Sequence, residues 1–596
     1  MKRIYTLFVS VMTITMALAG PIDLNRAQRI AQDFISKDRA ANVDVSFVVQ
    51  DMEVNGLHGA TSRYPSYYAF NSADGEGFVL VSGDDAFPLV LGYSNTGSFQ
   101  YGEDMPLALR RMLSSFDDYV EDVRLGLVEA PDVEEMMSQV TFREVPEMIN
   151  SKWAQYAPYN DLIPKEIKKN GQTASCPVGC VATAMAQIMR YYRYPEHPVF
   201  TGSKAWDVKG NKDAGSFSFK DITFDYANMP SKATITSPSA QKRAVALICA
   251  AASAAVDMQL SSDGSGAFDS DAMVAYYNIF GYSKASLDVV YRECYATQEE
   301  WNQLIYDEIM AGRPVQMGAV SDREGSGDGA GHSFILDGID AKGYVHVNWG
   351  WAGTCDAFYA IPYLNPKSTS FSYSFSQDQC AITGIQLPES DNEVLRQTSV
   401  YCYQPLGVFM RNTMRNAEFM IYLGEFYNYY NIPRTYSIGI GLFDQDGKFL
   451  ENVCSEDIED MTVDLDPYYG VIDTVGIEYG GQTCQIPRSY PDGNYTLRLI
   501  TLENGYTEWM EPDVVGGQAL NQIPIVLTST QIRFNASSTD IRRITDDKSL
   551  QEAKQMEFYS VDGRRISKPR AGQIYLEKSK DNQGRTIVSK RIGKER

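Results

Sequence analysis

Two helix-breaking residues stand directly in front of a strongly helical pattern, and they constrain the fold more than any other feature of this sequence. Pro177 and Gly179 do not readily continue a helix. Behind them, apolar residues recur at positions 181, 184, 185, 188, 189 and 192, which form one face of a helix. The sequence therefore predicts a buried helix that begins at about Cys180.

A cysteine at a helix N-terminus is a candidate nucleophile. The unpaired backbone amides and the positive end of the helix dipole both favour the thiolate, which is the reactive form. The alternative is a structural role, because free cysteines are among the most buried residues. A metal site formed by Cys176 and Cys180 is a weaker interpretation, since no second pair of ligands follows. This segment alone leaves catalysis and burial open.

The chain has only four histidines, at positions 58, 197, 332 and 346, which limits the choice of a catalytic base. None belongs to the His-Glu-x-x-His motif of zinc proteases, and no serine stands in a Gly-x-Ser-x-Gly motif. His332 ends a glycine-rich loop at residues 325–331 and opens an apolar run typical of a buried strand. Asn348, Trp349 and Trp351 follow, and an Asn or an aromatic wall can orient a catalytic imidazole. A purely structural histidine remains the alternative.

The overall charge and the cysteine content narrow the classes of partner. The formal net charge of -23 argues against a general nucleic-acid binder, because too little positive charge is left to neutralise phosphates. The nine cysteines are an odd number and too sparse for a disulfide scaffold. No cofactor or metal is predicted.

The residue patterns change several times along the chain. This is expected, because 596 residues are too many for a single hydrophobic core. Lys2 and Arg3 precede a short apolar run and small residues, which predicts a secretory signal, and no later run is long enough to span a membrane. The expected class is α+β. The predicted segments are a signal peptide at 1–19, a small α+β unit at 20–145, a larger region of helices and strands with glycine-rich loops at 146–390, a β-sandwich-like region at 391–530 and a last strand-bearing segment at 531–596.

Local patterns also predict individual elements. Helices are expected around residues 27–35 and after Pro106. Strands are expected at 78–81, 89–91, 435–442, 495–501, 556–561 and 574–576, where apolar residues run together or alternate between turns.

Three blocks of this sequence resemble the streptopain family of secreted, papain-like cysteine proteases. They are residues 180–191, 331–338 and 346–351, in matching order and spacing. The similarity extends to residues 153–155, 158–160, 81–84 and 91–94, and covers residues 25–390. It implies that residues 146–390 form a papain-like catalytic domain, with a helical part plus an antiparallel sheet.

The resemblance implies a role for each matching residue. Cys180 would form the acyl-enzyme, and His332 would act as base and then as acid. Trp349 and Trp351 would shape and shield the site, and Asn348 stands where papain-like enzymes orient their histidine. Gln155 would be an oxyanion donor beside the backbone amide of Cys180. The loop at 261–266 would line the substrate groove and prefer an apolar residue two positions before the scissile bond.

The resemblance also implies a precursor. Residues 20–145 would be an inhibitory propeptide, released by cleavage near residues 140–152, with a permanent structural domain as the alternative. The end of the chain resembles C-terminal sorting domains that hand proteins to secretion machinery, so the protein is expected to be secreted or held at the outer cell surface.

Two other functions stay open on the sequence. One is an inactive surface adhesion or binding protein, suggested by the large β-rich C-terminal part, and the other is acyl transfer on the same papain-like fold. An intact Cys180 and His332 favour peptide hydrolysis over the inactive protein. Cys176 is an extra thiol that could form a disulfide with Cys180 under oxidising conditions.

Overall fold

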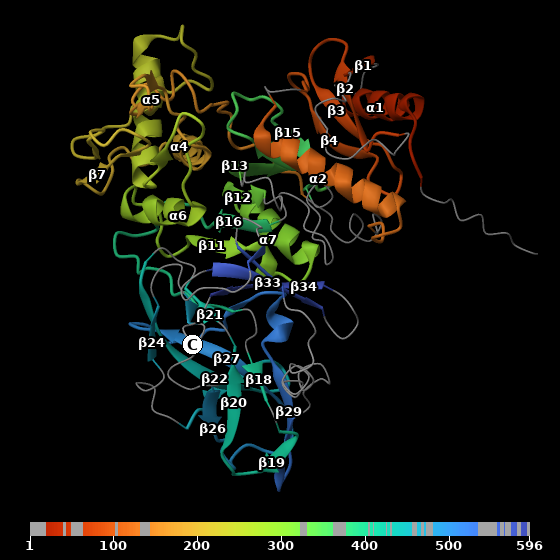
Figure 1. Ribbon diagram of the computed structural model, residues 1–596, viewed down its shortest axis with the longest axis vertical. Helices are drawn as coiled ribbons and strands as arrows, with labels where there is room; N and C mark the ends of the chain where they lie inside the picture. The colour runs from red at the N-terminus through yellow and green to blue at the C-terminus, as the bar shows by residue number, and fades with distance from the viewer. Residues whose placement is uncertain are drawn as a thin grey trace, which may run out of the picture. The chain divides into compact units, whose positions relative to one another are not determined.

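A computed structural model of the chain defines its fold (Figure 1). The described residues are 20–39, 43–48, 64–101, 105–131, 143–321, 330–361, 377–402, 406–408, 410–424, 426–428, 432–455, 462–465, 470–471, 481–534, 557–560, 565–566, 574–580 and 586–592. The predicted signal segment and most of the glycine-rich loop before His332 lie outside them.

The chain divides into two compact units. Unit 1 comprises Met1–Phe142, Ala341–Val345 and Thr354–Pro366, and unit 2 comprises Arg143–Asp340, His346–Gly353 and Lys367–Arg596. The sequence placed a boundary near residue 145, close to where unit 1 first ends. Two later segments nevertheless cluster with the N-terminal residues, so unit 1 is not one continuous stretch.

Unit 1 is a strand layer with two helices. Its elements are α1 (Leu24–Asp38), β1 (Val45–Phe47), β2 (Tyr67–Ser72), β3 (Phe78–Ser82), β4 (Val90–Ser94), α2 (Leu107–Arg124) and β15 (Ala357–Tyr359). Neighbouring strands pair antiparallel in the order β1-β2-β3-β4-β15. The predicted helical spacing is confirmed in α1, where Ala27, Ala31 and Ile35 are buried. The side chain of Asp23 caps this helix by accepting a hydrogen bond from the Arg26 amide.

The first part of unit 2 combines a helical layer with an antiparallel sheet. The helices are α4 (Cys180–Tyr192), α5 (Ser239–Ala255), α6 (Asp269–Asn278) and α7 (Gln298–Met310). The sheet strands are β11 (Asp288–Tyr291), β12 (Val315–Ser321), β13 (Ala330–Ile339), β14 (Val345–Asn348) and β16 (Gln377–Thr383), in the order β14-β13-β12-β16-β11. Figure 1 shows α4, α5 and α6 grouped beside these strands. The buried face of α4 supplies much of the core, as its apolar spacing predicts.

Short strand pairs complete this part of unit 2. They are β5 (Glu166–Ile167) with β6 (Thr173–Ala174), β7 (Ser203–Ala205) with β9 (Ser216–Ser218), and β8 (Asp207–Val208) with β10 (Gln259–Leu260). Strand β6 is followed by the segment that leads to Cys180, and strand β10 is followed by the loop at residues 261–266.

The C-terminal part of unit 2 is built from β-sheets around a core of its own. One sheet contains β19 (Asn412–Met414), β22 (Arg434–Phe443), β23 (Phe449–Asn452), β24 (Thr462–Leu465), β27 (Gly493–Glu503), β29 (Ile523–Leu527) and β30 (Gln531–Phe534). Smaller sheets contain β17 (Tyr401–Cys402), β21 (Phe426–Tyr427), β25 (Gly470–Val471) and β28 (Asp513–Val514), and β18 (Leu406–Gly407), β20 (Phe419–Leu423) and β26 (Gly481–Cys484). The strands expected at 435–442 and 495–501 are β22 and β27, which pair antiparallel.

A last antiparallel sheet lies near the end of the chain. It contains β31 (Glu557–Ser560), β32 (Arg565–Ile566), β33 (Ile574–Lys580) and β34 (Thr586–Ile592). The two strands expected there from the sequence are β31 and β33. Within the described residues, no helix is both long and apolar enough to cross a bilayer. The expected α+β class is confirmed.

The α4 core makes a testable prediction. Ile188 is fully buried on this helix, so Ile188→Ala should lower the free energy of unfolding by about 2–5 kcal/mol. Ile188→Val should lower it by only about 0.5–1.5 kcal/mol. Urea unfolding followed by tryptophan fluorescence measures both variants. The exposed Ile235 serves as control, since Ile235→Ala should stay within about 0.5 kcal/mol of the parent. Equal losses at positions 188 and 235 would contradict this account of the core.

Candidate active site

Helix α4 begins at Cys180, as the sequence predicts. Gly179 precedes it with φ 93°, a conformation that favours glycine. A Cβ at that position would lie 2.4 Å from the Cε atom of Met258, so only glycine fits there. Cys180 itself is half-buried, at the point where the helix exposes its unpaired amides.

His332 lies on β13 and is almost fully buried. Its Nε2 atom is 3.1 Å from the backbone carbonyl oxygen of Trp349. A carbonyl oxygen only accepts hydrogen bonds, so Nε2 carries the proton and Nδ1 is left as the basic nitrogen. The rings of Phe334 and Trp351 flank the imidazole at centroid distances of 6.3 and 6.4 Å. These contacts fix both the tautomer and the environment of the ring.

Cys180 and His332 meet through the residue that follows the histidine. The Cys180 thiol contacts the backbone of Ser333 on β13. No hydrogen bond joins the Cys180 thiol to the His332 ring, although both residues are described. The structure therefore places the Cys180 thiol against the residue that follows His332. In this arrangement the thiol proton is not shared with the imidazole.

Burial opposes the charged forms of both groups in this arrangement. Burial raises the pKa of the Cys180 thiol to about 11; the Ser333 contact opposes this shift and the nearby Asp269 carboxylate adds to it. Burial lowers the pKa of His332 to about 4, although the bond to Trp349 opposes this shift. The helix dipole favours a thiolate, but removal of the thiol from water outweighs it. Both groups are therefore neutral at pH 7.

None of the hydrogen bonds described for Asn348 involves His332; of the two alternatives considered for holding the imidazole, Asn348 or the tryptophans, it is Trp349 that bonds to the ring. Its side-chain nitrogen donates to the Ser151 carbonyl at 2.8 Å, and its oxygen accepts from the Gly350 amide at 3.0 Å. The Asn348 oxygen also accepts from Nε2 of Gln187 at 3.1 Å. Asn348 thus shapes the turn that carries Trp349, whose carbonyl holds the imidazole.

Gln187 was not singled out from the sequence. It is fully buried on α4, two turns after Cys180, and its Oε1 accepts from the Ser151 hydroxyl at 3.0 Å and the Trp153 amide at 3.2 Å. A polar residue inside the run of buried positions 181–189 was the only local signal. Its partners are more than thirty residues away, so the sequence did not reveal them.

A second buried glutamine joins the nucleophile helix to the strand of the histidine. Nε2 of Gln316 on β12 lies 3.3 Å from the Val181 carbonyl and 3.1 Å from the Ser333 hydroxyl. The Ser333 hydroxyl in turn donates to Asp269 at 2.6 Å. Burial raises the pKa of Asp269 to about 6, against the lowering effect of these donors. Neither Gln316 nor Asp269 was predicted.

Gln155 lies beside the segment that leads into Cys180. Its backbone carbonyl accepts from the Val178 amide at 2.9 Å, and the residue is largely buried. The contacts described for Gln155 involve its backbone only, so its side-chain amide is available to another acceptor. This placement is compatible with the oxyanion role expected from the sequence.

The remaining candidates are placed elsewhere. His346 pairs with the buried Asp337 at 2.6 Å, and His197 lies in an exposed loop, as expected. Cys176 and Cys180 are separate thiols, and the Cys176 thiol contacts the backbone of Glu166, so the disulfide considered above is not formed. Among the side chains that the structure describes, no group of three or more His, Cys, Asp or Glu residues could hold a metal ion.

Comparisons with known proteins match the part of the chain that contains these residues. Residues 153–359 fit the model of the Peptidase C10 family, and residues 19–120 fit the model of the Spi protease inhibitor. Residues 153–359 belong to the peptidase C10 family. This membership confirms the resemblance to streptopain and the predicted enzyme class, a cysteine peptidase made with an inhibitory N-terminal region.

Several relatives of this C10 peptidase are known. The thiol protease/hemagglutinin PrtT of Porphyromonas gingivalis is 30% identical over 403 residues, which are 65% of this chain and 44% of PrtT. Streptopain of Streptococcus pyogenes is 28% identical over 402 residues, which are 62% of this chain and 95% of streptopain. Active wild-type interpain A of Prevotella intermedia, a cysteine protease, is 34% identical, with 41% of this chain and 95% of interpain A covered and a TM-score of 0.36. A mutant fragment of prointerpain A is 28% identical, with 58% and 99% covered and a TM-score of 0.46.

The neutral thiol predicts how the unprocessed C10 chain reacts with an alkylating agent. Because the pKa of Cys180 is about 11, its alkylation rate should rise about tenfold per pH unit between pH 7 and pH 10. A short pulse of iodoacetamide followed by peptide mapping measures this rate, and the fully buried Cys249 serves as an internal control that stays unlabelled. A rate that is already constant between pH 6 and pH 9 would show a thiolate stabilised by His332 instead.

Proposed function

We propose that this C10 peptidase is an endopeptidase in which Cys180 is the nucleophile and His332 is the proton carrier. One observation carries the proposal. The thiol lies at the start of α4 against the residue next to His332, and the imidazole presents Nδ1 because Trp349 holds Nε2. A nucleophile beside an oriented base is the arrangement that covalent acyl transfer needs.

The reaction follows from these groups. Nδ1 of His332 takes the thiol proton, and the Cys180 sulfur attacks the carbonyl carbon of the scissile peptide bond. The tetrahedral intermediate collapses as Nδ1–H gives its proton to the leaving amine, which leaves a thioester on Cys180. Water, deprotonated by the same nitrogen, then attacks the thioester carbonyl, the C–S bond breaks to release the acid, and Nδ1–H returns the proton to the Cys180 sulfur. The thiol must first turn from the Ser333 backbone toward Nδ1, because the two side chains do not share a proton in the present arrangement.

Stabilisation of the oxyanion falls to donors at the helix start. The backbone amide of Cys180 is one of the unpaired donors at the N-terminus of α4. The side-chain amide of Gln155 is the second donor in this proposal, supported by its backbone bond to Val178. Trp349 and Trp351 close the histidine side of the site and exclude water from the imidazole.

The decisive test compares two cysteine variants. Cys180→Ala should abolish hydrolysis of a fluorogenic peptide and shortening of the precursor, whereas Cys176→Ala should keep both activities, because its thiol faces Glu166. His332→Ala should lower kcat by at least about 10³-fold. Full hydrolysis by the Cys180 variant would refute the nucleophile. Incorporation of an added amine in place of hydrolysis would identify an acyltransferase, and peptide binding without any turnover would identify a binding protein.

The organisation of the precursor belongs to the same proposal. Residues 1–19 serve as signal peptide, residues 20–145 as inhibitory propeptide, residues 146–390 as protease domain, residues 391–530 as a β-sandwich-like domain and residues 531–596 as a sorting domain. The Spi match at 19–120 supports the inhibitory region. The substrates are proteins or peptides, and the chain is secreted or kept at the outer surface through secretion machinery that recognises its C-terminal part.

Unit 1 suggests how the propeptide is retained. Strand β4 pairs with β15, which follows the catalytic histidine in the chain. The Tyr93 ring stacks on Phe358 at 5.5 Å and meets Tyr344 edge-on at 5.7 Å. Removal of residues 20–145 therefore has to separate this aromatic cluster and the β4–β15 pairing.

Truncation of that cluster should loosen the propeptide. Tyr93→Ala removes the stacked ring, so the precursor should become active severalfold faster than the parent. Phe47→Ala is the matched control, because Phe47 contacts only Tyr68 and Phe70 within residues 20–145 among its described ring partners. The onset of peptide hydrolysis after dilution of fresh precursor measures the difference. Equal acceleration in both variants would show that loss of stability in the N-terminal residues, and not loss of this cluster, controls activation.

A further inference from the structure

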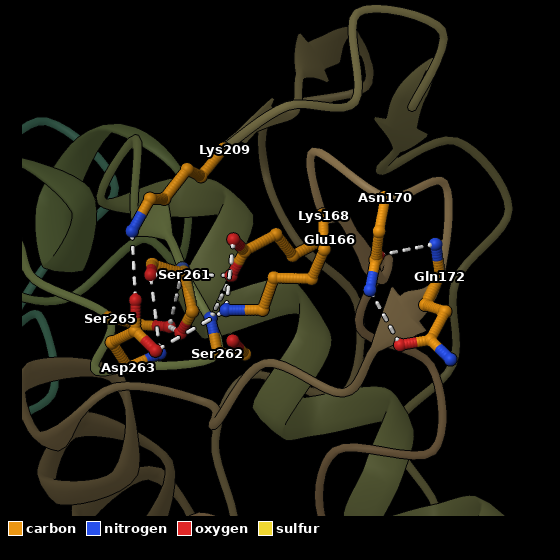
Figure 2. Close-up of polar contacts among 9 residues, drawn as sticks. All are labelled: Glu166, Lys168, Asn170, Gln172, Lys209, Ser261, Ser262, Asp263 and Ser265. Atoms are coloured by element: carbon orange, nitrogen blue, oxygen red, sulfur yellow. Dashed lines mark hydrogen bonds and ion pairs between the residues drawn. The ribbon is translucent and has the colours of Figure 1, made fainter.

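A polar cluster outside the catalytic pair joins a hairpin to the loop at residues 261–266 (Figure 2). The hairpin is formed by β5 and β6, and its last strand residue, Ala174, is followed by the segment that ends at Cys180. The loop is closed at its base by two backbone hydrogen bonds between Gln259 and Gly266. The hairpin is therefore close to Cys180 in the chain, and the loop is close to it in space.

The loop reaches the nucleophile segment through Ser265. Its hydroxyl donates to the carbonyl oxygen of Pro177 at 2.8 Å, three residues before Cys180. The far side of the loop is open, since a Cβ added at Gly264 or Gly266 would have no atom within 4 Å. An extended peptide that enters the site can thus approach the loop on that side.

Glu166 holds the loop from the hairpin side. Its side chain is almost fully buried, and Oε2 accepts from the Ser262 amide at 2.7 Å. The Ser261 hydroxyl lies 3.5 Å from the same oxygen. The amide of a loop residue is thereby satisfied by a carboxylate, which is the stronger type of hydrogen bond. Figure 2 shows the Glu166 carboxylate lying against Ser261 and Ser262.

Two lysines complete the cluster. Lys168 lies 3.2 Å from Glu166 and 3.3 Å from Asp263, and Lys209 lies 2.8 Å from Asp263. Hydrogen bonds from Ser262, together with Lys168, lower the pKa of Glu166 to about 2, so the carboxylate stays charged at any pH at which the enzyme works. Asp263 and the lysines are more exposed, so their ion pairs contribute less than the Ser262 bond.

The hairpin does not need the loop for its own shape. Lys168 and Gln172 pair across its turn through the backbone at 2.8 Å, and the Gln172 side chain accepts from Asn170 at 2.8 Å. Gly171 adopts φ 80° at the tip. The hairpin is thus a preformed support from which Glu166 projects toward the loop.

We propose that Glu166 is a positioning residue that sets the peptide preference of the enzyme by holding the 261–266 loop against the segment that leads into Cys180. This inference rests on the proposed function. Glu166 touches neither Cys180 nor His332, so it acts on the binding of extended substrates and not on the chemical step.

The test separates binding from chemistry with two substrates. One is a peptide that extends several residues before the scissile bond, and the other is a single-residue amide that cannot reach the loop. Glu166→Ala should raise KM for the long peptide about tenfold, because a hydrogen bond to a charged group is lost, and leave its kcat within about twofold. Its kinetics on the short amide and its rate of iodoacetamide labelling at Cys180 should match the parent enzyme.

Two further variants keep the test sharp. Glu166→Gln retains an acceptor for the Ser262 amide and should recover most of the KM, whereas Lys169→Ala, an exposed hairpin residue, should change nothing. An unchanged KM for the long peptide in Glu166→Ala would overturn the inference, as would an equal loss on both substrates. Failure of the parent enzyme to cleave either substrate would instead refute the proposed function.

Discussion

Two fully buried glutamines bind the helix that begins at Cys180 to the sheet that carries His332 and leads into Trp349, and the geometry of the site depends on them. Gln187 reaches from α4 to Asn348, and Gln316 reaches from β12 to the Val181 carbonyl on α4. A buried amide that loses its partner is strongly destabilising, so each glutamine fixes the distance between the elements it joins. The helix start and the histidine strand are held in register by these bonds as well as by apolar packing.

The same burial controls the chemistry. The partial burial of Cys180 and the burial of His332 favour the neutral form of both groups, although the helix start favours an anion. The chain thus holds Cys180 and His332 in an uncharged form. The bond from Nε2 of His332 to the Trp349 carbonyl leaves Nδ1 as the basic nitrogen of that ring.

The two units divide the chain in a way that bears on maturation. The segments 341–345 and 354–366 cluster with the N-terminal residues, while residues 346–353, which carry Trp349 and Trp351, belong to unit 2. A short stretch of chain therefore alternates between the unit that contains the Spi region and the unit that contains the nucleophile. Loss of the N-terminal residues changes the surroundings of segments that lie on both sides of the tryptophans in the chain.

The sequence by itself determined the features that depend on neighbouring residues. The start of α4 at Cys180, the apolar face behind it, the strands β22 and β27 and the α+β class all follow from local periodicity and from the conformational limits of Pro177 and Gly179. Only the tertiary structure decided the partners of each group. The bond between His332 and the Trp349 carbonyl, the raised pKa of the Cys180 thiol, and the contacts of Gln187, Gln316 and Glu166 depend on residues far apart in the chain and on burial. The local spacing of residues encodes neither contacts between distant residues nor burial, which is why these features could not be predicted.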